Sequence, residues 1–310
     1  MAEHDWIARY FKPLAIGDGA ARLSDDVAVL KASTRTIVTT DTLVEGIHFL
    51  PADPERSIGA KLVAVNVSDI IAKGALPKEA LLNLCWDARR NESGLAEFAK
   101  GFGDALGAWG IGLLGGDTTS HEGPRVLSLT VTGQVIGRGP VRRSGGKPGD
   151  SLWVTGRIGA GALGLRAARG AREYAEFLSA YRNPQPPPEA AAELIARNAT
   201  ASMDVSDGLL IDAARLAAAS ACGASLDLDR VPFAGPASTL DDRLLQVTGG
   251  DDYQALFAAP PGHATAIRSF ASENGIQVSP IGQLVAGTGL SIVHNEQAVN
   301  LPESLGFEHQ

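Results

Sequence analysis

Cysteine and aromatic residues are scarce in this chain. Its 310 residues include two cysteines, Cys85 and Cys222, which are too few and too far apart for a disulfide scaffold or a thiolate zinc site. Aromatic residues make up 5% of the chain, so the core must be built from Ala, Val, Leu and Ile. The low cysteine content fits a reducing compartment, and we expect a cytoplasmic protein.

Long apolar runs and an excess of positive charge are also missing. No window reaches the roughly 18 apolar residues of a membrane span, and residues 1–6 carry early acids instead of the apolar core of a secretion signal. Acidic side chains number 35 against 27 basic ones, which gives a net charge of −8. We therefore expect neither nucleic acid nor a membrane as a partner. Any phosphorylated ligand needs a local source of positive charge to bind.

Short β-rich runs alternate with Ala-rich segments, and 36 Gly and 17 Pro provide many tight turns. This pattern is typical of an α/β enzyme, and the predicted fold class is α/β (α+β). A Gly-rich turn at 144–150 predicts two domains, residues 1–143 and 144–310. The predicted strands are 35–41, 126–135 and 151–155, and the predicted helices are 57–73, 172–181 and 189–197.

Glycine-rich segments raise the question of a phosphate-binding loop. The Walker pattern fails, because Lys147 is followed by Pro148. Residues 159–164 match the dinucleotide pattern GxGxxG, but no second strand ending in an acid follows about 20 residues later. We predict that these glycines allow close packing at the start of a helix. A similar short sequence occurs twice, as LGGD at 114–117 and TGGDD at 248–252, which suggests two related ligand-binding turns.

Aspartates near the ends of predicted elements are the most informative feature. Ligands of open α/β sheets bind beyond the carboxyl ends of strands, where several acids would repel one another without a cation. Because the chain has no His-rich or Cys-rich ligand set, the expected ion is Mg²⁺, which prefers oxygen ligands and bridges carboxylates to phosphates. The acids are Asp25, Asp26, Asp41, Asp69, Asp117, Asp204, Asp207, Asp251 and Asp252.

Individual acids also have simpler explanations. Asp207, before Gly208, can cap a helix, and Asp69 can form a surface pair with Lys73 one turn later. Taken one at a time, these aspartates are explained as well by turns and caps as by metal binding. Together, five acid-bearing corners favour metal chemistry.

Six motifs occur in the order found in the thiamine-monophosphate kinases. They are LSDDVAV (23–29), TTDTLVEGIHF (39–49), NVSDI (66–70), GGDTT (115–119), DVSDGL (204–209) and GGDDY (249–253). The chain resembles this family from about Ile7 to Phe307. The second motif and the extended NVSDIIAKGA are specific to it, whereas GGD and the acid-rich corners mark a wider superfamily that includes aminoimidazole ribonucleotide synthetase.

The resemblance implies transfer of the γ-phosphoryl group of ATP to thiamine monophosphate, giving thiamine diphosphate and ADP. It also implies a two-domain aminoimidazole ribonucleotide synthetase-like fold and a homodimer in which N-terminal sheets pair. The implied catalytic residues are Asp41, Asp117 and Arg143. The implied ATP contacts are Gly116, Asp117, Arg143 and Ser206, and the implied substrate contacts are His48, Asp251 and Phe307. The implied ligands of several Mg²⁺ ions are Asp26, Thr39, Thr40, Asp41, Asp69, Asp117, Asp204 and Asp207.

Two positions depart from the family pattern. Ser24 stands where Gly is common, and Asp251 stands where Glu is common, which shortens the side chain by one methylene. The reaction needs no general base, because the second pKa of a phosphate monoester is about 6 and the acceptor oxygen is largely ionised near neutral pH. His48 has an alternative role as a packing or hydrogen-bonding residue.

Three other functions fit less well. A selenophosphate synthetase is expected to carry a reactive Cys near its N-terminus, whereas the first here is Cys85. A hydrogenase maturation dehydratase is expected to end in Cys, whereas this sequence ends in FEHQ. A nucleotide-binding protein without turnover would have lost metal-binding acids, and none is missing from the motifs.

Overall fold

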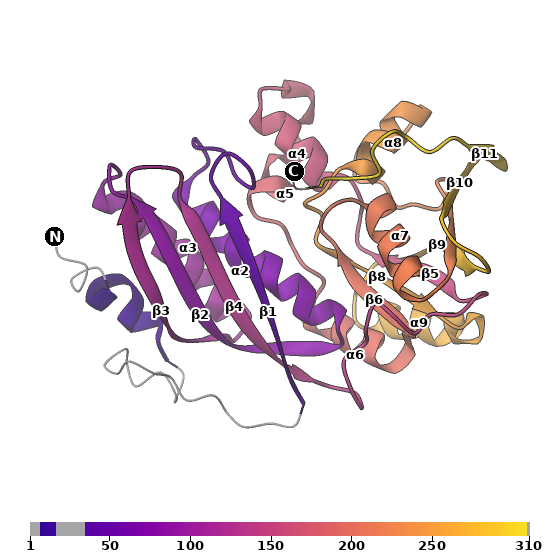
Figure 1. Cartoon of the computed structure of the whole chain (residues 1–310), viewed down its shortest axis with the longest axis horizontal. Coiled ribbons are helices and arrows are strands. Elements are labelled where there is room, and N and C mark those ends of the chain that lie inside the picture. Colours follow the sequence, from indigo (N-terminus) through magenta and orange to yellow (C-terminus); the bar gives the residue numbers. More distant parts are fainter. Residues whose placement is uncertain (1–6, 17–34, 309–310) are drawn as a thin grey trace. The chain divides into compact units, whose positions relative to one another are not determined.

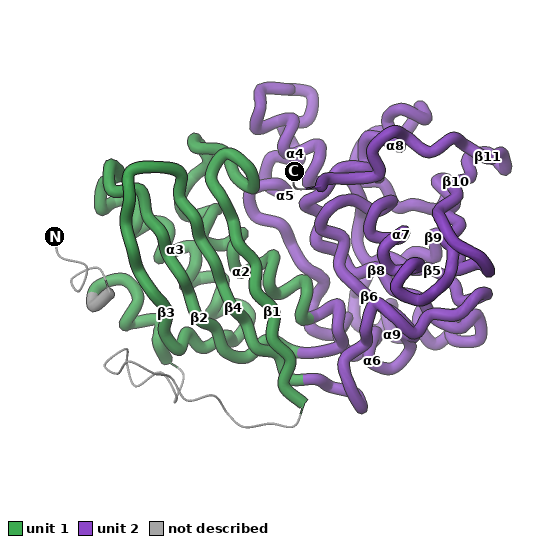
Figure 2. The backbone as a smooth tube through the Cα atoms, viewed as in Figure 1, with its two compact units in different colours: residues 1–70, 76–134 green, residues 71–75, 135–310 purple. Residues whose placement is uncertain are grey.

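The structure is a computed structural model that describes residues 7–16 and 35–308. The chain divides into two compact units (Figure 2). Unit 1 comprises residues 1–70 and 76–134, and unit 2 comprises residues 71–75 and 135–310. The units therefore divide at 134/135, and the Gly-rich turn 144–150 lies within unit 2. Within the described ranges, none of the helices combines the length and the hydropathy needed to cross a bilayer.

Unit 1 is a four-stranded sheet with helices on one face (Figure 1). The strand order is β1-β4-β2-β3, so β1 and β3 are the two edges. The strands are β1 (Thr36–Val44), β2 (Ala75–Asp87), β3 (Gly112–His121) and β4 (Val126–Val135), and the long helices are α2 (Glu55–Ala72) and α3 (Glu92–Ala108). β1 pairs with β4 antiparallel, and β2 pairs with β3 in parallel.

Helix α2 is buried on nearly all sides. From Ile58 to Ala72 every residue is buried except Ala60 and Asp69, because the helix is apolar around most of its circumference. Gly133 on β4 lies so close to Ile70 that a Cβ atom there would meet the Ile70 side chain at 2.7 Å. Asp69 is therefore a polar, partly exposed point on a helix that is otherwise packed against the sheet.

Unit 2 is a seven-stranded, largely antiparallel sheet of order β11-β10-β7-β9-β5-β8-β6. Its strands are β5 (Ser151–Thr155), β6 (Ala201–Val205), β7 (Gly223–Asp227), β8 (Gln254–Ala259), β9 (Val278–Val285), β10 (Leu290–His294) and β11 (Gln297–Val299). Its α-helices are α4 (Ala160–Ala168), α5 (Leu178–Arg182), α6 (Glu189–Asn198), α7 (Leu209–Ala219), α8 (Leu240–Thr248) and α9 (Ala264–Glu273). One apolar cluster contains residues of β5, β6 and α7.

Most predicted elements are confirmed. The strands 126–135 and 151–155 occur at those residues, and the helices 57–73 and 189–197 appear within two residues of the predicted ends. The strand 35–41 is longer than predicted. It continues to Val44, because β4 supplies partners as far as Val126, so Asp41 lies inside β1 and not at its end.

The glycine-rich motifs have structural roles. β5 pairs antiparallel with both neighbours, so the sequence 159–164 does not follow a parallel strand as in dinucleotide-binding folds. Gly159 is the N-cap of α4 with φ +96°, and a Cβ on Gly164 would meet Tyr181 Cβ at 2.7 Å. Close packing at this helix start is thus confirmed. The two GGD segments are not equivalent, because 115–117 lies inside β3 and 249–251 follows α8.

Candidate active site

In unit 1, one group of predicted ligands lies where β1 meets α2. The Thr39 hydroxyl donates to Asp69 Oδ2 at 2.5 Å. β1 is an edge strand, and the Asp41 N–H donates to Asn66 Oδ1 at 3.1 Å, while Asn66 Nδ2 donates to the Leu62 carbonyl at 3.0 Å. Thr39, Asp41 and Asp69 are therefore brought together, with Asn66 fixing the separation of strand and helix.

Thr40 lies on the other face of the sheet. Side chains alternate along a strand, so Thr40 points away from the face that Thr39 and Asp41 share. The Thr130 hydroxyl donates to Thr40 Oγ1 at 3.1 Å, and Thr42 and Ser128 share a 2.7 Å hydroxyl contact one pair further along. The structure thus separates the Thr40 side chain from the other two predicted ligands on β1.

Gly116 and Asp117 lie on β3, the opposite edge of the same sheet. Gly116 has φ +156°, and a Cβ there would collide with the carbonyl oxygen of Leu82 on β2, which explains the glycine. Asp117 is exposed, and its Oδ1 accepts the Thr118 N–H at 3.0 Å. Asp41 and Asp117 lie three strand spacings of about 4.8 Å apart, which corresponds to a distance of about 14 Å across the sheet. One Mg²⁺ cannot bind both carboxylates of a single chain, because its ligand distances are about 2 Å.

His48 lies in a tight turn that follows β1. The Gly46 N–H donates to the Phe49 carbonyl at 2.7 Å, and the Val44 N–H donates to His48 Nδ1 at 3.0 Å. A backbone N–H can only donate, so Nδ1 is an acceptor and the neutral ring carries its proton on Nε2. The ammonium group of the buried Lys61 donates to the His48 carbonyl at 3.0 Å. His48 therefore acts as a hydrogen-bonding residue, which is the alternative role considered for it from the sequence.

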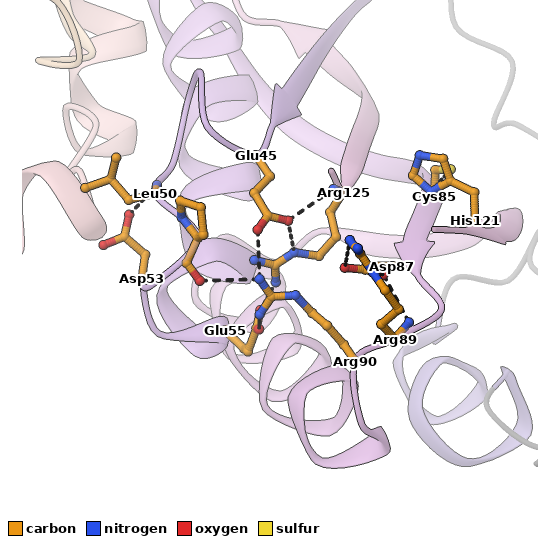
Figure 3. A network of polar contacts seen from close by, with 11 residues as sticks. Glu45, Leu50, Asp53, Glu55, Cys85, Asp87, Arg89, Arg90, His121 and Arg125 are labelled. Carbon is orange, nitrogen blue, oxygen red and sulfur yellow. Dashed lines mark hydrogen bonds and ion pairs between the residues drawn. The ribbon is translucent and has the colours of Figure 1, made fainter. Parts of the chain in front are cut away.

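Two arginines and two glutamates hold this turn in place (Figure 3). Arg125 Nε donates to Glu45 Oε2 at 2.9 Å, and Arg125 Nη1 also donates to Glu55 Oε2. Arg90 donates to the other oxygen of each glutamate, at 2.8 Å in both cases. Burial opposes ionisation of Glu45, but the hydrogen bonds from Arg125 outweigh it and hold the pKa of Glu45 below its ordinary value.

The Arg125 side chain is fully buried between two aromatic rings. Its guanidinium carbon lies 5.0 Å from the centre of the Phe49 ring and 5.2 Å from that of Trp86. Phe49 ends the turn that carries His48, and Glu55 is the first residue of α2. Both ends of the segment 45–55 are therefore fixed by the same arginine pair.

In unit 2, the motif 204–209 forms the end of β6 and the start of α7. Asp212, in the first turn of α7, accepts the N–H groups of Ser206 and Asp207 at 3.1 Å and of Gly208 at 3.3 Å. Burial raises the pKa of Asp212 to about 6, against these hydrogen bonds. Asp212 therefore accepts the N–H groups at the start of α7. It fills the capping role that the sequence suggests as an alternative for Asp207.

Asp207 instead pairs with an arginine. Arg215 donates from Nη1 to Asp207 Oδ2 and to Asp212 Oδ1, the latter at 3.1 Å. Asp204, a predicted metal ligand two residues before Ser206, is buried within β6. The two predicted acids of this motif thus have different surroundings, one in the core strand and one in an ion pair.

Predicted substrate residues converge on the same corner of unit 2. The Asp251 N–H donates to the Ser206 carbonyl at 2.9 Å, and the Phe307 N–H donates to the Asp207 carbonyl at 2.9 Å. Gly306 permits the second approach, because a Cβ there would lie 2.6 Å from the Asp207 carbonyl oxygen. The Phe307 residue is 44% exposed, so its ring is accessible. One predicted ATP residue, one predicted metal ligand and two predicted substrate residues, from three distant segments, therefore meet.

Arg143 lies at the other end of these elements. Its carbonyl accepts the hydroxyl of Ser220, the residue after α7, at 3.0 Å, and the preceding Arg142 carbonyl accepts the N–H of Ser202 at the start of β6. Ser206 follows the end of β6 and precedes α7, so the main chain of Arg143 is not brought to Ser206. The predicted metal ligand Asp26 lies outside the described residues.

The donor chemistry fits Mg²⁺ better than a softer metal. The residues gathered at β1 and α2 offer hydroxyl and carboxylate oxygens, which are hard ligands. Across residues 7–16 and 35–308, no three His, Cys, Asp or Glu side chains gather as a complete ion cage. Ligands from phosphates, from hydroxyl groups or from a second subunit are then needed to complete a coordination shell.

Sequence reasoning missed the structural roles of several residues that shape the site. Asp212 follows Gly208 by four residues, a spacing that places it in the first turn of the helix. Asp252 accepts the N–H groups of Gly159 at 2.7 Å and Gly161 at 3.1 Å, which links the second GGD segment to α4. For Arg125 the sequence offers no local signal, because its partners lie 70 and 80 residues away.

Comparisons with known proteins place these features in a family. Residues 24–138 match the family described as AIR synthase related protein, N-terminal domain, and residues 147–295 match its C-terminal domain. Thiamine-monophosphate kinase of Caulobacter vibrioides is 38% identical over 99% of this chain and 90% of that protein.

Solved structures agree. Thiamine-monophosphate kinase from Stenotrophomonas maltophilia K279a superposes with a TM-score of 0.81 and 31% identity, over 93% of this chain and 94% of that one. AaThiL complexed with AMPPCP and TMP superposes with a TM-score of 0.74 and 27% identity, over 91% of this chain and 90% of that one. Since the similarity extends over nearly the whole chain in both sequence and structure, the chain belongs to the thiamine-monophosphate kinase family.

Proposed function

We propose that this protein transfers the γ-phosphoryl group of ATP to thiamine monophosphate, giving thiamine diphosphate and ADP. The observation that carries the proposal is the meeting of Ser206, Asp207, Asp251 and Phe307 in unit 2, since the family resemblance assigns these residues to the nucleotide, the metal and the thiamine phosphate. A related structure complexed with AMPPCP and TMP supports the pairing of an ATP analogue with this substrate.

Phosphoryl transfer between two anions needs alignment and charge neutralisation more than a base. Phe307 offers an exposed ring for the cationic thiamine rings, while the carboxylate of Asp251 offers an acceptor. The N–H groups at the start of α7 are occupied by Asp212. We therefore assign nucleotide contacts to the Ser206 hydroxyl and not to an anion hole at this helix start.

Mg²⁺ is part of the proposal. Thr39, Asp41 and Asp69 in unit 1, with Asp26, Asp117, Asp204 and Asp207, supply the oxygen ligands, and bound Mg²⁺ would neutralise the phosphate chains. Because the Thr40 side chain points away from Thr39 and Asp41, Thr40 would bind Mg²⁺ through a main-chain atom, or bind it on the other face of the sheet. The Thr39–Asp69 contact already brings one hydroxyl and one carboxylate to a common point.

A homodimer is also proposed. Asp41 and Asp117 lie on opposite edges of one sheet, about 14 Å apart by three strand spacings. Sheet pairing between two subunits would allow an acid on β3 of one chain to approach β1 of the other. The sheet face without helices carries Val38, which is 67% exposed, beside the hydroxyls of Thr40 and Thr42. An interface there would cover this apolar side chain.

The decisive experiment supplies ATP, Mg²⁺ and thiamine monophosphate, and identifies the products by chromatography. Thiamine diphosphate and ADP are expected in equal amounts. ADP with free phosphate and no thiamine diphosphate would refute the assignment. Calorimetric titration of Mg²⁺ into wild type and Asp69→Asn tests the metal separately, with weaker binding expected in the variant. Sedimentation of wild type and Val38→Lys tests the dimer, since a buried charge would dissociate it.

A further inference from the structure

The segment Asp251-Asp252-Tyr253 holds an unusual backbone conformation. Asp251 has φ +70° and Tyr253 has φ +51°, so two non-glycine residues out of three lie in the left-handed region. Such residues are uncommon, and an aromatic residue is more strained there than an aspartate. Strain of this kind persists only where surrounding contacts hold it, and it concentrates at functional sites.

Contacts on both sides hold this segment. The N–H of Asp251 donates to the Ser206 carbonyl at 2.9 Å, and the N–H of Tyr253 donates to the Val205 carbonyl at 2.8 Å. Between them, the buried carboxylate of Asp252 turns the other way and accepts N–H groups at the start of α4. The main chain of Asp251 is therefore fixed relative to both β6 and α4.

The side chains of Asp251 and Tyr253 also meet. The Tyr253 hydroxyl donates to Asp251 Oδ1 at 2.8 Å, and Tyr253 is only 7% exposed. A hydrogen bond from a nearly buried phenol to a carboxylate fixes the orientation of the carboxylate plane. This hydrogen bond links the side chains of the two left-handed residues to each other.

We propose that Tyr253 is a positioning residue that sets the Asp251 carboxylate for an N–H or cationic group of the thiamine moiety. This inference rests on the proposed function, which places Asp251 on the substrate. Tyr253 acts through Asp251 and does not itself contact the substrate. The contact also accounts for the shorter acid at 251, since the family's usual Glu would place its carboxylate one methylene further from the main chain.

The first test is Tyr253→Phe, which removes one hydroxyl and keeps the ring. The KM for thiamine monophosphate should rise about 2- to 12-fold, the range given by one hydrogen bond of ordinary strength. The KM for ATP should stay within about 2-fold, because the nucleotide contact of Ser206 is unaffected. Tyr181→Phe is the matched control, since Tyr181 is 2% exposed and lies in the same unit on α5.

A double-mutant cycle separates positioning from general stability. If Tyr253 acts through the carboxylate, Tyr253→Phe should add less than 2-fold to the KM for thiamine monophosphate in an Asp251→Asn background. Equal effects in both backgrounds would overturn the proposal. So would a lower Tm with unchanged KM for both substrates, which would make the hydroxyl a structural contact only.

Calorimetric binding of thiamine monophosphate distinguishes this inference from the proposed function. A wild-type protein that binds the compound without phosphorylating it would refute the function, while the Kd of Tyr253→Phe would still report on positioning. A Kd equal to that of wild type overturns the role of Tyr253. A wild-type protein that neither binds nor phosphorylates thiamine monophosphate refutes both.

Discussion

Replacing Arg125 by Met should destabilise the protein strongly. The side chain is fully buried, and its guanidinium neutralises Glu45 and Glu55, which are themselves largely buried. Removing one partner of a buried ion pair costs about 3 to 5 kcal/mol, because the remaining charge keeps its desolvation penalty. Arg90 still pairs with both glutamates, so the expected loss lies at the low end, about 3 kcal/mol.

The free energy of unfolding can be measured by urea denaturation, followed by tryptophan fluorescence and circular dichroism. Arg89→Met is the matched control: its side chain is 61% exposed and pairs with Asp87, so the expected loss is at most about 1 kcal/mol. Adding Glu45→Gln and Glu55→Gln to Arg125→Met should recover part of the loss, since the unpaired charges are then gone. Equal losses for Arg125→Met and Arg89→Met would refute the buried-network argument.

Three further predictions concern the site. Asp41→Asn and Asp117→Asn should each lower kcat at least about 100-fold in the ATP and thiamine monophosphate assay with little change in Tm, because each removes charge from a proposed cation site. A near-normal kcat would make that acid structural. Burial raises the pKa of Asp252 to about 7 from 3.8, so the folded state retains a proton that the unfolded state loses, and the free energy of unfolding should fall as pH rises from about 4 to 7. Asp252→Asn should flatten that slope in urea denaturation at pH 5, 6 and 7, and an unchanged slope would assign it to other groups. Gly306→Ala should raise the KM for thiamine monophosphate by displacing Phe307, whereas Gly262→Ala, with nothing within 4 Å, should not; equal KM values would detach Phe307 from the substrate.

The elements with strong local patterns could be predicted from the sequence. The alternation along 126–135 and the Ala-rich run at 189–197 specify strand and helix by themselves. The end of β1 could not be placed in this way, because Thr42 to Val44 extend the strand only through their partners on β4. The length of an edge strand depends on its neighbour, which is 80 to 90 residues away in sequence.

The arrangement of the site depends on information that motifs do not contain. The sequence groups Thr39, Thr40 and Asp41 as neighbours, whereas the pleat of β1 places Thr40 on the other face. Asp41 and Asp117 are two acids of one motif set, but the strand order puts them on opposite edges. Strand order and pleat are properties of the whole sheet, so the motifs identify candidate ligands without determining which of them meet.

The contacts of two proposed metal ligands predict that their affinities for Mg²⁺ differ. Asp207 is paired with Arg215, so a metal ion at Asp207 must displace a guanidinium group or share the carboxylate with it. At Asp69 the fixed contact is the Thr39 hydroxyl, a neutral donor that can itself serve as an oxygen ligand. The desolvation cost of entry is therefore smaller at Asp69, and the tighter Mg²⁺ site should lie there. Arg215 is then the resident counter-charge of Asp207, and Arg215→Met should tighten Mg²⁺ binding at Asp207 if the ion and the guanidinium compete for that carboxylate.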